Sequence, residues 1–197
     1  MMHKFLISAG LLGLLTTSAF AGDTSFYIKA LGGGVFESPQ FWSRGFGQTI
    51  YPMNGGWDAG ATLGYYLSDN FSVETDVFHT NTTYNCCAPN GLQSTSVMGN
   101  VVGHLNVSGP VGVYGGLGVG AVDVAYVNLN PASNGNAWVF GGQAFGGVEV
   151  SVSKNISLLA EYRYQLASNA QLNLAGFGST TVGYNASLVS AGLEFKF

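Results

Sequence analysis

The chain has 197 residues, of which 8% are charged and 13% aromatic, and its formal net charge is −4. Ordinary soluble domains contain about 25% charged residues, and one this poor in charge would expose too much apolar surface to stay dispersed. The mild negative charge comes without a basic patch, so no nucleic acid is expected as a partner. A chain whose outer surface faces lipid avoids the problem.

The first 21 residues have the pattern of a cleaved secretory signal. A basic start at His3 and Lys4 precedes an apolar run, and the small-residue exit Ala19-Phe20-Ala21 follows it. We therefore expect a signal peptide over 1–21 and a single mature domain over 22–197. The alternative is a retained N-terminal anchor. No later stretch approaches the ~20 apolar residues that a membrane helix needs.

The mature chain is divided by short and long connections that alternate. The short polar turns are Ser68–Asn70, Ser108–Pro110 and Ser153–Asn155, and the longer, irregular connections are Glu37–Gly56, Asn81–Ser94, Tyr126–Ala137 and Ala167–Val182. This alternation is typical of an all-β, up-and-down transmembrane barrel with short periplasmic turns and long outer loops. It predicts eight antiparallel strands, over Ser25–Phe36, Trp57–Leu67, Phe71–Thr80, Thr95–Val107, Val111–Ala125, Trp138–Val152, Ile156–Gln165 and Tyr184–Phe197.

Each predicted strand has an apolar face and a polar face. In the last one, Val189, Leu193 and Phe197 alternate with Ser190 and Glu194, which is the period of a strand between two environments. No strand needs a charge on its apolar face. The ionisable residues assigned to the inner face are six acids, three bases and one histidine: Lys29, Asp58, Glu74, Asp76, His104, Glu149, Glu161, Arg163, Glu194 and Lys196.

An eight-stranded barrel is just wide enough for side chains to fill it. We therefore interpret these inner residues as a structural network of ion pairs and hydrogen bonds. Paired carboxylates could also suggest acid–base catalysis, but a substrate would not reach them. Because acids outnumber bases, some carboxyl groups should be protonated, hydrated or bound to a cation.

Aromatic residues gather at the ends of the apolar faces and predict two interfacial girdles. They are Trp57, Trp138 and Tyr164 at the loop end, and Phe26, Tyr65, Phe71 and Phe197 at the turn end. The alternative, a soluble lipocalin-like barrel, would need a far more charged exterior.

Three strand motifs resemble a known family. Val113–Gly120, Phe145–Glu149 and Ala160–Tyr164 are similar to strands of the opacity-type outer-membrane β-barrels, relatives of the membrane domain of outer membrane protein A. The resemblance implies an eight-stranded barrel in the outer membrane of a Gram-negative bacterium, surrounded by lipid. It also implies that the barrel-assembly machinery recognises the last strand, with Phe197 as its signal. The family includes adhesins, membrane-stabilising proteins and members without a known role.

The connections carry the remaining candidates. Phe41, Trp42, Phe46 and Tyr51 in the first one are candidate contacts for a surface or host partner, although they could instead pack on the barrel rim. Cys86 and Cys87 are the only cysteines. In an oxidising envelope we expect them to form a disulfide, with each other or with a second chain.

We predict a structural and adhesin-like, surface-interacting role, without catalytic residues, cofactor or metal site. A small pore is one alternative, because Gly112, Gly116, Gly118 and Gly120 on the inner face could leave room for water. A lipid-modifying barrel enzyme is another. His79 points outward near the outer rim, but we expect neither a serine nor a carboxylate in register with it.

Overall fold

The computed structural model describes residues 25–37, 40–44, 47–51, 54–83, 91–127, 135–174 and 178–197. The predicted signal peptide lies outside these residues. The strands are β1 (Phe26–Glu37), β2 (Gln40–Arg44), β3 (Gly47–Tyr51), β4 (Gly56–Ser68), β5 (Phe71–Thr83), β6 (Gly91–Ser108), β7 (Val111–Val127), β8 (Gly135–Ser151), β9 (Ile156–Leu174) and β10 (Gly178–Lys196). The described part of the chain has no helix long and apolar enough to cross a membrane.

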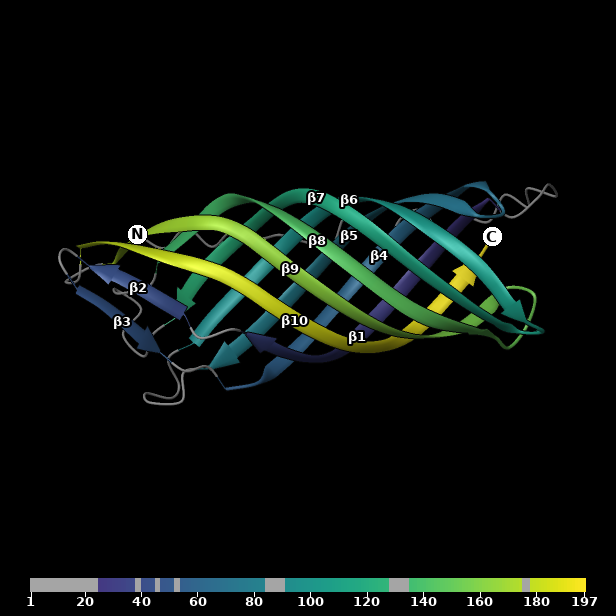
Figure 1. Cartoon of the computed structure of the whole chain (residues 1–197), viewed down its shortest axis with the longest axis horizontal. Helices are drawn as coiled ribbons and strands as arrows, with labels where there is room; N and C mark the ends of the chain where they lie inside the picture. The colour runs from purple at the N-terminus through teal and green to yellow at the C-terminus, as the bar shows by residue number, and fades with distance from the viewer. Residues whose placement is uncertain are drawn as a thin grey trace, which may run out of the picture.

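Eight of these strands form a closed antiparallel ring. β1 pairs with β4, and each strand from β4 to β10 pairs with the next. β1 and β10 close the ring over a register from Tyr27↔Lys196 to Glu37↔Ala186. The ring is seen from the side in Figure 1, with its strands inclined to the long axis. The predicted eight-stranded barrel is confirmed, and so are the three tight turns at one end, where Gly109 adopts a positive φ of 54°.

The inward and outward faces agree with the predicted alternation in every strand of the ring. In β5, Ser72, Glu74 and Asp76 are buried, whereas Phe71 and Val73 are exposed. Outward apolar residues and inward charges are what a barrel in lipid requires. Placing a charge in hydrocarbon is costly, so the charged residues of each strand show which of its faces points inward.

The strands continue further towards the outer end than the sequence suggested. The prediction that Ala167–Val182 is irregular is wrong, because β9 runs to Leu174 and β10 begins at Gly178. In this outer part the chemistry of the two faces is reversed. Ser168, Asn169 and Gln171 of β9 are exposed, while Ala170 and Leu172 are buried.

The outer interior holds an apolar core like that of a soluble barrel, beside the buried hydroxyl groups of Thr80, Thr82 and Ser94. Its side chains are at most 1% exposed, and they are Val35, Leu92, Val122, Val124, Ala170, Leu172, Val182, Ala186 and Leu188. A strand that leaves the membrane no longer needs an apolar outer face, so its apolar residues turn inward. This reversal explains why the sequence pattern did not show that these segments are strands.

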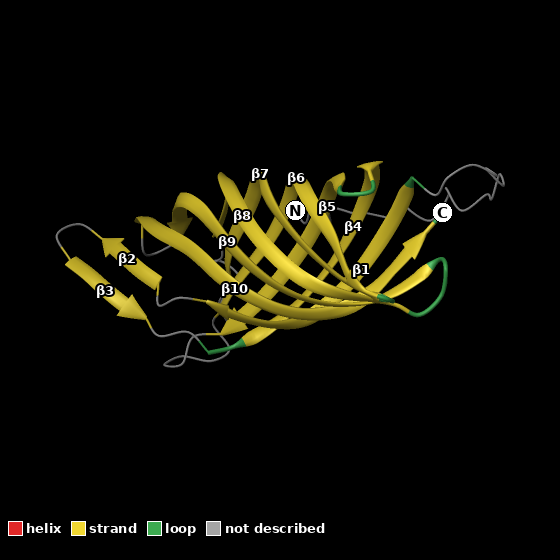
Figure 2. Cartoon of the chain, turned by 45° about the vertical axis from the view of Figure 1, so that its right-hand side comes forward, coloured by secondary structure: helices red, strands yellow, loops and turns green. Residues whose placement is uncertain are grey.

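The first long connection is also structured, since it forms the hairpin of β2 and β3. β2 pairs with the outer part of β10 through Ser43↔Thr181 and Trp42↔Val182. β10 thus pairs with β1 in its inner part and with β2 beyond the end of β1. Figures 1 and 2 show the hairpin projecting past the ring at the end opposite the turns.

Candidate functional site: the barrel interior and the outer rim

Arg163 is the centre of the buried charges. Its Nη1 lies 2.7 Å from Asp76 Oδ2, and its Nη2 lies 2.9 Å from Glu161 Oε1. The guanidinium lies between two rings, with its Cζ 3.9 Å from the centroid of Phe78 and 4.6 Å from that of Phe145. A planar cation between aromatic faces, with carboxylates at its edge, has both its charge and its surface satisfied. Arg163 is thus held on all sides.

Amide side chains complete this cluster. Asn100 Nδ2 and Gln143 Nε2 both donate to Asp76 Oδ2, each at 2.8 Å. Gln143 Oε1 in turn accepts from Arg163 and from Gln165, at 3.1 and 2.9 Å. The two glutamines were not predicted as site residues, although both occupy inward positions of the strand alternation, which could have identified them.

Lys29 is the centre of a second cluster nearer the turn end. Its Nζ lies 2.6 Å from Glu74 Oε1 and 4.3 Å from the ring centroid of Tyr114. The Tyr27 hydroxyl donates to the same Glu74 oxygen at 2.6 Å. His104 Nε2 lies 2.8 Å from Ser72 Oγ, which is itself 2.7 Å from the Tyr27 hydroxyl. These bonds connect β1, β5 and β6.

The remaining predicted inner residues lie at the two ends of this network. Lys196 Nζ is 3.1 Å from Glu194 Oε1 and 3.8 Å from Glu149 Oε1, at the turn end. Asp58 accepts hydrogen bonds from Ser190 Oγ at 2.6 and 3.1 Å, and it takes part in no ion pair among the described residues. Among the described residues, nine of the ten predicted inner residues thus take part in ion pairs or in the hydrogen bonds of His104. Asp58 is bound by the Ser190 hydroxyl instead.

Several buried carboxylate oxygens have no hydrogen-bonding group from the described residues. They are Glu74 Oε2, Asp76 Oδ1 and Glu149 Oε2. The two oxygens of Glu194 face the ammonium groups of Lys196 and Lys29, at 3.1 and 3.9 Å. An excess of acids in a closed interior requires protons, water or counter-ions to offset the charge. No group of three or more His, Cys, Asp or Glu side chains in the described ranges could hold a metal ion.

The inward glycines are covered by neighbouring side chains. A Cβ at Gly116 would lie 2.6 Å from the ring of Phe145, and one at Gly112 would lie 3.0 Å from Glu149 Cγ. Asn100 and Met98 cover Gly118 and Gly120 in the same way. The missing side chains of these glycines make space for large neighbours, which fill room that the pore alternative would leave for water.

The outer surface carries the aromatic residues assigned to the girdles. Phe26 and Tyr65 pack together with ring centroids 4.7 Å apart at the turn end, near Phe71 and Phe197. Trp57 and Trp138 are more than half exposed near the other end. Tyr164 lies near the middle of β9 rather than at its end, because that strand continues to Leu174.

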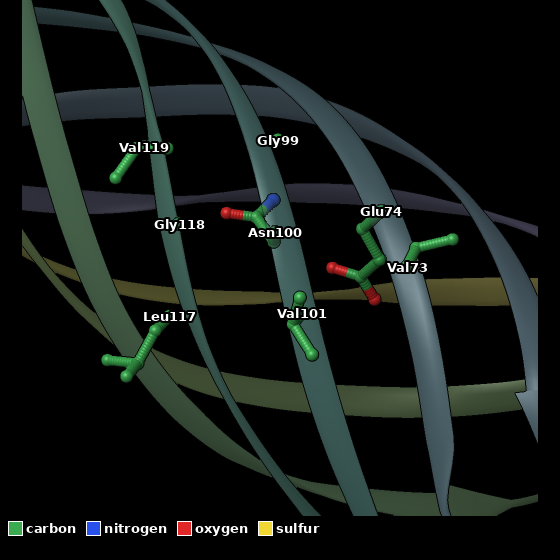
Figure 3. A pocket seen from close by; sticks show the side chains of 8 residues that line it. All are labelled: Val73, Glu74, Gly99, Asn100, Val101, Leu117, Gly118 and Val119. Atoms are coloured by element: carbon green, nitrogen blue, oxygen red, sulfur yellow. The ribbon is translucent and has the colours of Figure 1, made fainter.

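A shallow depression of about 390 Å³ lies in the wall formed by β5, β6 and β7 (Figure 3). Its outer lining is Val73, Val101, Leu117 and Val119, and Gly99 contributes no side chain to fill it. Glu74 and Asn100 also line it but are themselves only 4% exposed. The depression is therefore an apolar part of the lipid-facing surface.

The expectation that no carboxylate is in register with His79 is wrong, whereas the hydroxyl beside His79 is that of a threonine and not of a serine. Thr95 of β6 is its register partner, with Oγ1 at 3.0 Å from His79 Nδ1, and Asp123 of β7 is the next in the same row. A hydroxyl and a carboxylate therefore do lie in register on the outward face. The carboxylates on the same strand as His79, Glu74 and Asp76, both point inward.

Two groups of predicted residues remain, the cysteines and the aromatic residues of the first long connection. Cys86, Cys87 and Phe46 lie outside the described residues. The backbones of Phe41, Trp42 and Tyr51 lie in β2 and β3.

A closed ring of tilted strands with charges inside and an apolar band outside defines a transmembrane β-barrel. Residues 7–197 match the model of the outer membrane protein beta-barrel domain. The chain belongs to this family, and it is an integral protein of the outer membrane of a Gram-negative bacterium. No curated protein matches the sequence.

Solved structures with the same fold include Neisserial surface protein A (NspA), at 19% identity with a TM-score of 0.62, where the alignment covers 87% of this chain and 97% of that one. The outer membrane protein OprG of Pseudomonas aeruginosa has 14% identity and a TM-score of 0.55, covering 88% and 98%. The N-terminal β-barrel domain of OprF from the same organism has 15% identity and a TM-score of 0.53, also covering 88% and 98%. Identities this low show the fold alone.

Proposed function

We propose that the protein is a closed structural barrel whose specific contacts are made by its outer end, as in an adhesin-like surface protein. The competing functions are a small pore and a lipid-modifying enzyme. The single observation that carries the proposal is the filling of the interior at the level of Arg163.

A cation held by two acids and two rings, with glutamine and asparagine side chains around it, occupies the cross-section where a pore would need water. Phe145 lies over Gly116 on the same wall, so the missing side chain of this glycine does not widen the lumen. Towards the outer end the interior becomes apolar. An ion would have to pass the buried charges around Arg163 and then a largely apolar core, which argues against conduction.

The outer end has the features of a binding surface supported by a rigid scaffold. The strands extend it beyond the apolar band, and the β2–β3 hairpin adds two strands beside β10. Loops and hairpins held by a stable sheet commonly carry the binding residues of a protein. The partner we propose is a surface or host molecule bound by this end. Lipid and the assembly machinery, through the strand that ends at Phe197, are partners in insertion.

Conductance separates the closed barrel from the pore. Purified protein should give no stable, large channel in a planar bilayer, while a general porin in the same membrane serves as the positive control. Reproducible currents of porin size from the unmodified protein would overturn the proposal.

Attachment tests the outer end. Replacing residues 40–51 by a Gly/Ser linker should leave the barrel folded, since β10 keeps its pairing with β9 and β1, but should abolish attachment of expressing cells to a surface. Trp42→Ala and Phe46→Ala should weaken attachment by about 2 kcal/mol each if they act as hot spots. A change of the turn residues Asp69 and Asn70, at the opposite end, is the matched control. A sharp fall in melting temperature with attachment intact would show that the hairpin is structural.

A further inference from the structure

A row of three polar side chains crosses the lipid-facing surface near the outer end. His79 of β5 is paired with Thr95 of β6, and Thr95 is paired with Asp123 of β7. All three lie on the outward face and are half-buried. They do not belong to the interior network or to the β2–β3 hairpin.

The row marks the edge of the apolar band. One step towards the turn end, the register row is Val77, Val97, Ala121 and Phe140, all of them apolar and exposed. The Trp57 ring packs against that of His79 at a tilt of 50°, with ring centroids 5.5 Å apart, and Trp138 is the register partner of Asp123. Indoles on both sides of a polar row are typical of the level where hydrocarbon meets lipid headgroups.

The contacts within the row separate donors from acceptors. His79 Nδ1 lies 3.0 Å from Thr95 Oγ1. When the imidazole donates this hydrogen bond, the Thr95 hydroxyl is left to donate outward. Asp123 accepts a hydrogen bond from Asn136 Nδ2 at 2.9 Å through Oδ1, which leaves Oδ2 for a cationic group. The row thus presents a hydroxyl donor beside a carboxylate.

We propose that this row binds the headgroup of a membrane lipid that carries a phosphate and a primary amine. Thr95, whose hydroxyl is oriented by His79, donates to a phosphate oxygen, and Asp123 accepts from the ammonium. Side chains on neighbouring strands are about 4.5–5.5 Å apart, which suits a phosphate and an amine joined by two carbons. The acyl chains of the same lipid extend along the row of Val77, Val97 and Ala121.

Other uses of the row fit less well. A phosphate without an amine would be repelled by Asp123. A hydrolase needs a carboxylate that orients the imidazole, whereas Asp123 lies beyond Thr95, on the side away from His79. The described residues also include no group of three metal-ligating side chains of His, Cys, Asp or Glu that could hold a cation.

Lipid retention measured by native mass spectrometry tests the proposal. Protein in detergent micelles is mixed with phosphatidylethanolamine, phosphatidylcholine or phosphatidylglycerol of the same acyl chains. Phosphatidylethanolamine should be retained about tenfold more strongly than the other two, because only its ammonium can donate hydrogen bonds to Asp123. Asp123→Asn should remove this preference, and Thr95→Val should weaken retention of all three lipids.

The matched control is Asp69→Asn, in an exposed turn at the opposite end, which should change nothing. Heat-modifiable migration on gels confirms that each variant is folded. Equal retention of the three lipids, or an Asp123→Asn variant that keeps the preference, would overturn the proposal. Free phosphoethanolamine should not displace the lipid at equal concentration, and displacement would show that the site takes a soluble ligand instead.

Discussion

Arg163 of β9 reaches Asp76 of β5 across the barrel interior, with 2.7 Å between Nη1 and Oδ2. Three strands separate β5 from β9 along the wall, so the ion pair spans the interior rather than joining neighbours. Both side chains are at most 1% exposed. The pair therefore ties opposite sides of the barrel together.

Arg163→Ala should lower the free energy of unfolding by about 3–5 kcal/mol, because Asp76 and Glu161 would keep their buried charges without the cation. Urea unfolding in lipid vesicles, followed by tryptophan fluorescence, gives this difference. Lys154→Ala, in an exposed turn, is the control and should have little effect. An Arg163→Ala barrel as stable as the control would mean that solvent already screens the cluster.

The inward and outward faces could be predicted from the sequence, because a charge in the lipid-facing row would be expensive. The pairing of Arg163 with Asp76 could not, since the residues are 87 positions apart and alternation gives no information about which strands face each other across the lumen. The outer ends of β9 and β10 were missed for a different reason. There the polar residues face outward and Leu172 and Val182 face inward, so the pattern of a membrane strand no longer applies.

Gly116→Ala should destabilise the barrel by about 1–3 kcal/mol, as overpacking of a filled interior does. Its Cβ would lie 2.6 Å from the Phe145 ring and 2.9 Å from the Val101 carbonyl oxygen. Its neighbour Gly115 faces outward, and a Cβ there would meet nothing closer than a carbonyl oxygen at 3.4 Å. Gly115→Ala is thus a control in the same strand. Equal unfolding midpoints for the two variants would show that Phe145 moves aside without cost.

Deletion of Phe197 should prevent insertion. Its backbone N–H donates to the Phe26 carbonyl at 2.9 Å and extends the closing pairing of β10 with β1. The variant should accumulate in the periplasm as unfolded, protease-sensitive protein, as measured by fractionation and gel migration. Phe71→Ala removes another exposed aromatic residue at the turn end but leaves the closing strand intact. Normal, heat-modifiable barrel after the deletion would show that the terminal residue is dispensable.

Leu172→Asn tests the apolar core at the outer end. Leu172 is 0% exposed, and burying an amide there without a partner while removing apolar contacts should cost about 2–5 kcal/mol. The loss should be local, since the membrane-spanning part of β9 has its own ion pairs and hydrogen bonds around Arg163. Hydrogen exchange should therefore become faster in the outer parts of β9 and β10, with protection unchanged around Glu161 and Arg163. Gln171→Asn, at the exposed neighbouring position, should leave exchange unchanged throughout. Faster exchange along the whole of β9 would show instead that the outer core and the membrane barrel unfold as one unit.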